Sequence, residues 1–331
     1  MARHRYSLSS YIDGITSGDR FILSQAITLV ESHRPDDQLL ASRILQSLPP
    51  PSPSTLRIGI TGVPGVGKST FIESFGVLLT QQQHSVAVLT VDPSSEKTKG
   101  SILGDKTRMP TLAQSPLAYI RPSATGRTLG GVAHQTREAI LLCEAAGYHI
   151  ILIETVGVGQ SETEVHRLTD FFLLLMLAGA GDELQGIKKG VMELADAIVI
   201  NKAEGDNRTA ARQAQQAYRN ALQLFRSPES DVPPRVLTCS ALQREGLSEI
   251  WNFIDHYRAS TQANGYFYQK RQQQNLRWMH QLVQNHLERQ FYQHPQLAQQ
   301  RPHIEQEVKA GTLTAQQGAE ALIALYEKNG R

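Results

Sequence analysis

Cysteine is scarce in this chain, and its scarcity argues against two kinds of site. Cys143 and Cys239 are the two cysteines among the 331 residues. They form neither a Cys-x-x-Cys pair nor a disulfide framework, so we do not expect a zinc or iron–sulfur centre. This usage suits a reducing cytosol, and each cysteine is best interpreted as a small, buried apolar side chain.

Long apolar runs and an excess of charge of one sign are also missing. The longest apolar run, Phe171 to Ala178, is far shorter than the ~20 residues that cross a bilayer. Residues 1 to 20 lack the apolar core of a signal peptide. The 33 basic and 31 acidic residues are interspersed and give a net charge of +2, so charge does not favour binding to nucleic acid or to an anionic membrane. We therefore expect a soluble cytoplasmic protein without a nucleic-acid or membrane partner.

The chain does have a glycine-rich segment between a β-prone stretch and a helical pattern. It matches G-x-x-x-x-G-K-[S/T], a motif whose backbone N–H groups close on phosphates. In that motif Lys68 reaches the β and γ oxygens, and the Ser69 hydroxyl binds Mg²⁺. The helix that follows would point its partial positive charge at the same phosphates. The residues predicted to hold the phosphates are Gly62, Val63, Pro64, Gly65, Val66, Gly67, Lys68, Ser69 and Thr70.

From Thr55 onward, short β-branched runs alternate with helical patterns. Several of these runs are apolar on both faces, which is typical of a parallel sheet covered by helices on both sides. We therefore predict a doubly wound, mostly parallel α/β domain. The predicted strands are 57–61, 86–91, 118–121, 149–154, 170–177, 197–201 and 235–239.

Two appendages flank this predicted domain. Apolar residues at helical spacing predict helices over 19–32 and 36–48, and the prolines between Pro49 and Pro53 end this N-terminal extension. Beyond Gln262 the chain becomes glutamine-rich and helical, with an apolar stripe and no sheet to cover. We interpret that segment as a helical dimerisation arm, with packing against its own domain as the alternative. The predicted division is 1–54, 55–260 and 261–331.

The segment Asn201-Lys202-Ala203-Glu204 follows a buried strand, where GTP-binding proteins carry Asn-Lys-x-Asp. The acidic side chain there accepts hydrogen bonds from guanine N1–H and the 2-amino group, a donor pair that adenine lacks. A buried carboxylate left unpaired by the wrong base is costly, so the segment predicts guanine selectivity. The weaker motif Ser240-Ala241-Leu242 follows the last strand and is similar to the loop that contacts guanine O6.

Carboxylates also follow buried strands at the positions expected for a metal site. Glu154 and Gly157 stand where many GTPases have Asp-x-x-Gly, so Glu154 would hold Mg²⁺ and Gly157 would donate its N–H to the γ-phosphate. Asp92 ends another strand, and Asp105 lies in a polar segment after it. The predicted catalytic residues are Lys68, Glu154 and Gly157, and the predicted metal ligands are Ser69, Asp92, Asp105 and Glu154.

Two further features bear on turnover and coupling. Val158 follows Gly157, where small GTPases carry their water-orienting glutamine, so we expect slow intrinsic hydrolysis that a partner accelerates. A long glycine-rich segment from Leu177 to Gly190 exceeds the usual length of a strand-to-helix connection, which favours a functional loop. Its candidate switch residues are Asp182, Glu183, Lys188 and Lys189.

Taken together, five motifs resemble those of the MeaB/ArgK family of P-loop GTPases, in the SIMIBI class, over roughly residues 20 to 330. The resemblance implies a homodimeric GTPase chaperone that protects an adenosylcobalamin-dependent methylmalonyl-CoA mutase and gates its cofactor loading. It also implies metal and switch roles for Asp92 and Glu154, and a loop around Lys188 that contacts the mutase. Glu204 departs from the aspartate of many relatives. The motifs are Gly62-Val-Pro-Gly-Val-Gly-Lys-Ser, Val91-Asp-Pro-Ser-Ser, Glu154-Thr-Val-Gly-Val-Gly-Gln-Ser-Glu, Ala178-Gly-Ala-Gly-Asp-Glu-Leu-Gln-Gly-Ile-Lys-Lys-Gly and Asn201-Lys-Ala-Glu.

Two alternatives remain open from the sequence. Members of this family have also been described as an ATPase or kinase coupled to lysine/arginine/ornithine transport, although Asn201-Lys202 argues against ATP. A metal-insertion GTPase of the same class is the other alternative. Such proteins use Cys/His metal motifs, whereas the 11 histidines here are scattered.

Overall fold

The computed structural model describes residues 5–50, 54–91, 108–122, 129–155, 161–179, 189–223 and 229–328. The chain divides into two compact units, Met1–Tyr268 and Gln269–Arg331. The boundaries predicted at residues 54 and 260 stay predictions. Within the described ranges, no helix is both long enough and apolar enough to cross a membrane.

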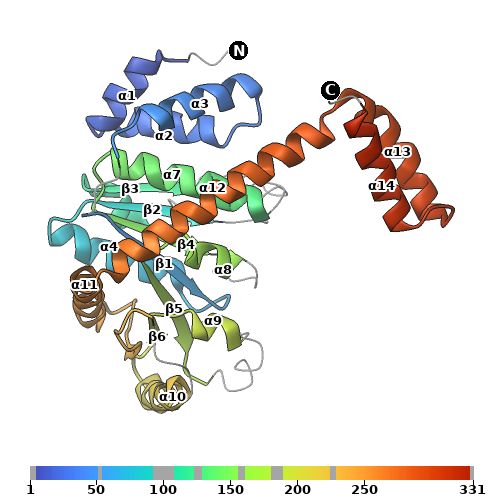
Figure 1. Ribbon diagram of the computed structural model, residues 1–331. Helices are drawn as coiled ribbons and strands as arrows, with labels where there is room; N and C mark the ends of the chain where they lie inside the picture. Colours follow the sequence, from blue (N-terminus) through green and yellow to red (C-terminus); the bar gives the residue numbers. More distant parts are fainter. Residues whose placement is uncertain are drawn as a thin grey trace. The chain divides into compact units, whose positions relative to one another are not determined.

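The first unit is built on a parallel sheet, as the sequence predicts (Figure 1). Its seven strands follow the order β3-β2-β4-β1-β5-β6-β7, so the P-loop strand β1 lies in the middle of the sheet. Each predicted strand is present, with ends that differ by about one residue. The strands are β1 Leu56–Gly62, β2 Val86–Val91, β3 Ala118–Pro122, β4 Ile150–Thr155, β5 Phe171–Leu177, β6 Ala197–Asn201 and β7 Arg235–Thr238.

Helices cover both faces of this sheet, which is why its central strands are apolar throughout. One face carries α4 (Lys68–Gln81), α6 (Pro110–Gln114) and α11 (Leu247–Ala263), packed on side chains such as Ile58 and Leu152. The opposite face carries α7 (Leu129–Ala145), α8 (Ser161–His166) and α10 (Asn207–Leu222), packed on side chains such as Ile151 and Ile198. A short helix, α9 (Lys189–Glu193), precedes β6. The predicted doubly wound fold is therefore confirmed.

The N-terminal helices pack against the sheet unit and share a hydrophobic cluster with α7. The predicted helices over 19–32 and 36–48 correspond to α2 (Arg20–Val30) and α3 (Pro35–Ser47). The sequence analysis did not predict α1 (Leu8–Thr16), whose N-terminus is capped by the Ser7 side chain. Tyr11 and Ile15 of α1 are fully buried, so this helix contributes to the core.

The second unit is helical, as predicted for the C-terminal segment. It contains α13 (Pro295–Ala310), α14 (Ala315–Glu327) and most of α12 (Tyr266–Tyr292), which begins in the first unit. A capping box formed by Thr314 and Gln317 starts α14. Gly318 allows α14 to approach α13, because a Cβ there would lie 2.6 Å from a methyl carbon of Val308. Large apolar side chains stay exposed along α12, namely Leu276, Met279, Leu282, Val283 and Leu287.

Candidate nucleotide site

The predicted phosphate loop connects the end of β1 to the start of α4, in the middle of the sheet. Two glycines explain its path. A Cβ on Gly62 would lie 2.4 Å from the carbonyl oxygen of Leu175 on β5, so β1 and β5 can approach only with glycine there. Gly67 is the N-cap of α4 and has a φ of 92°, a conformation that side-chain-bearing residues rarely adopt. The loop therefore presents its backbone at the N-terminus of a helix, where anions are favoured.

Lys68 folds back over its own loop. Its Nζ donates hydrogen bonds to the carbonyl oxygens of Gly62 at 2.7 Å and Val63 at 3.3 Å. Burial lowers the pKa of Lys68 from its ordinary value, while the nearby carboxylates of Glu154 and Glu162 act in the opposite direction. The ammonium is thus held at the phosphate loop, within electrostatic range of two carboxylates.

Ser69 and Glu154 bring two oxygen ligands together. The Ser69 hydroxyl on α4 donates to Oε1 of Glu154 at 3.2 Å, although Glu154 lies on β4. The parallel pairing of β1 with β4 aligns Ile60 with Glu154, which brings the carboxylate to the level of the phosphate loop. Hard oxygen donors of this kind fit Mg²⁺, so the residues present suit the predicted metal. The other predicted contributors, Asp92, Asp105 and Gly157, lie outside the described residues.

The structure adds residues that the sequence analysis gave no role. Glu162 on α8 is 5% exposed and close enough to Lys68 to affect its pKa. On the other face of β4, the hydroxyl of Thr155 donates to that of Thr61 at 2.8 Å in a fully buried pair. The only sequence signal for Glu162 was its place in the quoted Gly-Gln-Ser-Glu motif. Nothing local in the sequence pairs Thr61 with Thr155, because they lie 94 residues apart.

Asn201, at the end of β6, connects three segments. Its side chain is almost fully buried, and Nδ2 donates to the carbonyl oxygen of Val66 in the phosphate loop at 2.9 Å. Its Oδ1 accepts from the backbone N–H of Ala241 at 3.1 Å and from the thiol of Cys239 at 3.4 Å. The structure therefore brings together the three predicted nucleotide-binding segments, at the carboxyl ends of parallel strands.

Lys202 lies directly above the phosphate loop. Its backbone has φ of 59°, in the left-handed region, and its exposed Nζ donates to the carbonyl oxygen of Gly65 at 2.9 Å. The side chain of Asn207 donates to the carbonyl oxygen of Lys202 at 2.7 Å and so holds this turn. Ala203 donates its N–H to Cys239, which continues the pairing of the two strand ends. This strained turn directs Lys202 across the loop and leaves Glu204 beside it.

Glu204 has the property expected of a base-reading carboxylate. The residue is half-buried, and its Oε2 is shielded from solvent without a hydrogen-bond partner among the described residues. A buried carboxylate oxygen left in this state is costly, so a ligand that brings donors would bind favourably. Guanine supplies two donors on one edge, N1–H and the 2-amino group, whereas adenine does not.

The segment Ser240-Ala241-Leu242 closes the same region. Ser240 is buried and forms a two-residue antiparallel bridge with Glu245. The carbonyl of Ala241 accepts from the hydroxyl of Ser74 on α4 at 2.7 Å, which ties this loop to the P-loop helix. Leu242, by contrast, is 75% exposed. Buried neighbours thus hold the loop while the Leu242 side chain stays at the surface, next to the predicted base site.

Lys189 is the one predicted switch residue within the described ranges. Asp182, Glu183 and Lys188 lie outside the described residues. The backbone of Lys189 begins α9, just before the strand β6 that carries Asn201. The switch assignment stays a prediction.

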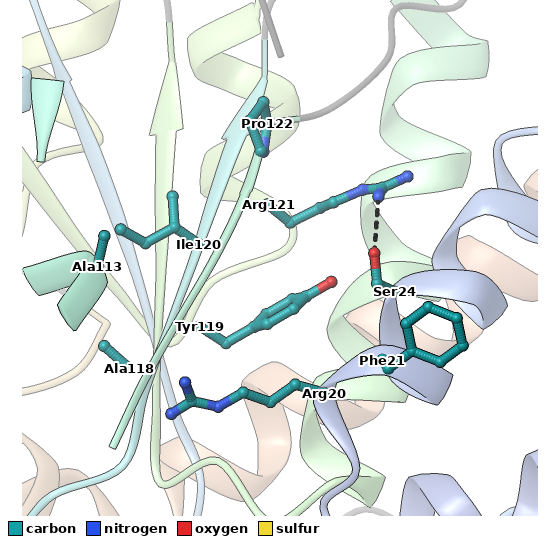
Figure 2. Close-up of a pocket in the computed structure, with 9 residues that line it drawn as sticks. All are labelled: Arg20, Phe21, Ser24, Ala113, Ala118, Tyr119, Ile120, Arg121 and Pro122. Atoms are coloured by element: carbon teal, nitrogen blue, oxygen red, sulfur yellow. Dashed lines mark hydrogen bonds between the residues drawn. The ribbon is translucent and has the colours of Figure 1, made fainter. Parts of the chain in front are cut away.

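A separate cavity of about 390 Å³ lies at the edge strand β3, between α2 and α6 (Figure 2). Arg121 extends from β3 to the Ser24 hydroxyl at 3.2 Å, and it also binds Thr28 and Glu31 of the same α2 region. Arg20 donates to backbone carbonyls of the loop before β3. The arginines that line this cavity are thus engaged in joining the N-terminal helices to the sheet. None of the predicted nucleotide-binding residues lines it.

Comparison with known proteins agrees with this geometry. The family model described as methylmalonyl Co-A mutase-associated GTPase MeaB matches residues 23–296. GTPase ArgK of Escherichia coli (strain K12) is 51% identical over 273 residues, covering 82% of each chain. The mitochondrial methylmalonic aciduria type A homolog of Mus musculus is 45% identical over 324 residues, covering 95% of this chain and 78% of that protein. A crystal structure titled LAO/AO transport system kinase is 39% identical with a TM-score of 0.75, covering 99% of this chain and all of that one. The chain belongs to the MeaB family of methylmalonyl-CoA mutase-associated GTPases.

Proposed function

We propose that this protein binds GTP and GDP with Mg²⁺, hydrolyses GTP slowly, and protects an adenosylcobalamin-dependent methylmalonyl-CoA mutase while gating its cofactor loading. The single observation that carries the nucleotide assignment is the buried Glu204 oxygen, which lacks a hydrogen-bond partner among the described residues and lies in a segment joined to the phosphate loop through Asn201. The family description supports the mutase as partner.

The proposed site has a phosphate-binding end and a base-binding end. At the phosphate end, Lys68 turns from its loop carbonyls to the β and γ oxygens, and the backbone of residues 62–67 encloses them. Ser69 and Glu154 are the described residues that would hold Mg²⁺, and the bound ion would neutralise charge on the phosphates. At the base end, Glu204 accepts from the guanine edge. Gly157, Asp92 and Asp105 complete this proposal from the sequence.

The coupling role is assigned to the loop that contains Asp182, Glu183, Lys188 and Lys189. Its sequence is long, glycine-rich and charged, and it ends at α9, close in the chain to β6 of the nucleotide site. A loop that contacts the γ-phosphate differently in two arrangements would transmit nucleotide state to a bound mutase. A mutase that stabilises the hydrolysing arrangement would also accelerate turnover, since Val158 stands in place of a water-orienting glutamine.

We also propose that the protein is a homodimer that acts in the cytoplasm. The support for the dimer is the row of exposed apolar side chains along α12, with Leu276, Met279, Val283 and Leu287 recurring on one side of the helix. An exposed stripe of this kind is costly in water unless a partner covers it. A second copy of the same helix is a self-complementary partner for it.

A calorimetric titration tests the nucleotide assignment. Mg·GDP and Mg·ADP are titrated into nucleotide-free protein, and GDP should bind at least about 100-fold more tightly, since adenine leaves Glu204 unpaired. ADP binding within threefold of GDP would overturn the assignment.

Lys68→Ala should abolish hydrolysis, because it removes the positive charge that meets the transferred phosphoryl group.

The transport-coupled kinase remains the competing function, because one relative's crystal structure carries that title. It predicts tight ATP binding and transfer of the γ-phosphate to a protein acceptor. The same titration, repeated with ATP and followed by assay for phosphorylated protein, separates the two functions.

A further inference from the structure

Cys239 is a buried thiol that contacts Asn201 and lies within electrostatic range of Glu204, two residues of the proposed nucleotide site. It follows β7 directly and is 2% exposed. Its Sγ lies 3.4 Å from Oδ1 of Asn201 and is the donor of that hydrogen bond. Burial raises the pKa of this thiol to about 12, and the charge of Glu204 contributes in the same direction. The sulfur therefore keeps its proton at neutral pH and remains a donor.

This bond defines which way the Asn201 amide faces. The amide oxygen accepts from two donors, the Cys239 thiol and the Ala241 N–H, while the amide nitrogen donates to the carbonyl oxygen of Val66. If the amide were flipped, its nitrogen would face the two donors, Cys239 and Ala241, and its oxygen would face the carbonyl oxygen of Val66. Such mismatches are costly in a buried site. Cys239 and Ala241 thus act together to orient the side chain that supports the phosphate loop.

We infer that Cys239 is a positioning residue for guanine-nucleotide binding, which acts by orienting Asn201 rather than by touching the nucleotide. The inference rests on the proposed function, because it concerns GTP and GDP affinity. The sequence alone indicated only that Cys239 is a small, buried apolar side chain. A buried thiol can donate a hydrogen bond to Asn201 or simply fill space in the core, so the test has to separate these two roles.

Cys143 provides a matched control. It is also a fully buried thiol, but it lies on α7 in the hydrophobic cluster of the opposite face of the sheet. Cys143→Ala and Cys239→Ala remove the same atom from a packed interior, so both should lower thermal stability. Only Cys239→Ala removes a hydrogen bond to Asn201. Cys239→Ser keeps a donor on nearly the same side chain.

The experiment measures Mg·GDP affinity by calorimetry and thermal unfolding without nucleotide, for full-length wild type and the three variants. Cys239→Ala should weaken GDP binding about three- to tenfold, the range of one net hydrogen bond. Cys239→Ser should stay within about threefold of wild type, and Cys143→Ala should leave the affinity unchanged. Unchanged GDP affinity in Cys239→Ala, or an equal loss in Cys143→Ala, would overturn the inference.

A double-mutant cycle tests whether Cys239 affects GDP affinity through Asn201. In an Asn201→Ala background, adding Cys239→Ala should change GDP affinity less than twofold, because the side chain through which the thiol acts is gone. An additive loss would mean that Cys239 acts by another route. If wild type fails to prefer GDP over ADP, the proposed function and this inference both fall. If wild type prefers GDP and Cys239→Ala keeps full affinity, the inference alone falls.

Discussion

Nδ2 of Asn201 donates a hydrogen bond of 2.9 Å to the carbonyl oxygen of Val66, 135 residues earlier in the chain. This bond fixes the end of β6 against the phosphate loop, so the two parts of the proposed nucleotide site cannot move independently without breaking it. The hydrogen bond therefore couples the position of the base-reading segment to that of the phosphate loop.

Glu204→Gln should weaken GDP binding by about 100-fold or more. The amide retains one acceptor but sets a donor against guanine N1–H or the 2-amino group, and it removes the charge from the hydrogen bonds. Calorimetry with Mg·GDP measures the loss. Glu245→Gln is the control, because Glu245 is an exposed carboxylate in the neighbouring loop that pairs with Arg208. Equal affinities for the Glu204 and Glu245 variants would contradict the assignment of Glu204 as the base reader.

Charge placed on the α12 stripe should dissociate the proposed dimer. In the full-length chain, Met279→Glu combined with Val283→Glu sets like charges against each other across a two-fold interface. Light scattering should show the mass fall to that of one chain. Gln273→Glu, an exposed polar position on the same helix, should leave the mass unchanged. A dimer that persists in the double variant would show that this stripe does not form the interface.

A truncation that tests the proposed dimerisation arm must keep the residues that pack in the core of the first unit. Phe267 is 3% exposed and belongs to the same hydrophobic cluster as Phe71 of the P-loop helix. Ending the chain after Ser260 would remove it and cut α11, whereas ending it after Tyr268 follows the boundary between the compact units. Removing residues 269–331 should therefore give a monomer that still binds GDP. Retention of the dimer in that truncation would refute the assigned arm.

Lys188→Ala should separate basal from stimulated turnover. The variant should hydrolyse GTP within a few fold of wild type, yet lose most of the acceleration seen on adding an adenosylcobalamin-dependent mutase. The reason is that the loop couples nucleotide state to the partner and performs no chemistry in the proposed scheme. Phosphate release with and without mutase is the assay. Loss of basal hydrolysis with normal GTP binding would instead make Lys188 catalytic within its own chain.

Glu144→Ala should destabilise the protein by about 3 kcal/mol or more, because it leaves Arg57 charged and buried. Arg57 of β1 donates to both carboxylate oxygens of Glu144 on α7, at 2.8 and 2.9 Å, and both side chains are almost fully buried. Denaturant unfolding measures the change. Glu245→Ala breaks the exposed pair with Arg208 and should cost about 1 kcal/mol at most. Similar losses in the two variants would contradict the importance of burial.

The seven strands were predictable because their signal is local. Continuous apolar runs such as Ile150 to Ile153 recur between helical patterns, and only a sheet covered on both faces buries them. Helix α1 was missed although its apolar residues recur at helical spacing, because its 9 residues are fewer than the window over which such spacing is diagnostic. Its burial depends on contacts with α2 and α7 rather than on its own composition.

Residue types at short spacings were enough to predict the phosphate loop, the succession of strands and helices along the chain, and the candidate base-reading segment. Those spacings cannot encode the contacts that the folded sheet creates: Asn201 donates to Val66, Cys239 donates to Asn201, and a buried oxygen of Glu204 lacks a partner within the described ranges. These relationships join residues from separate strand ends. They exist only once the parallel sheet brings the carboxyl ends of its strands to one edge.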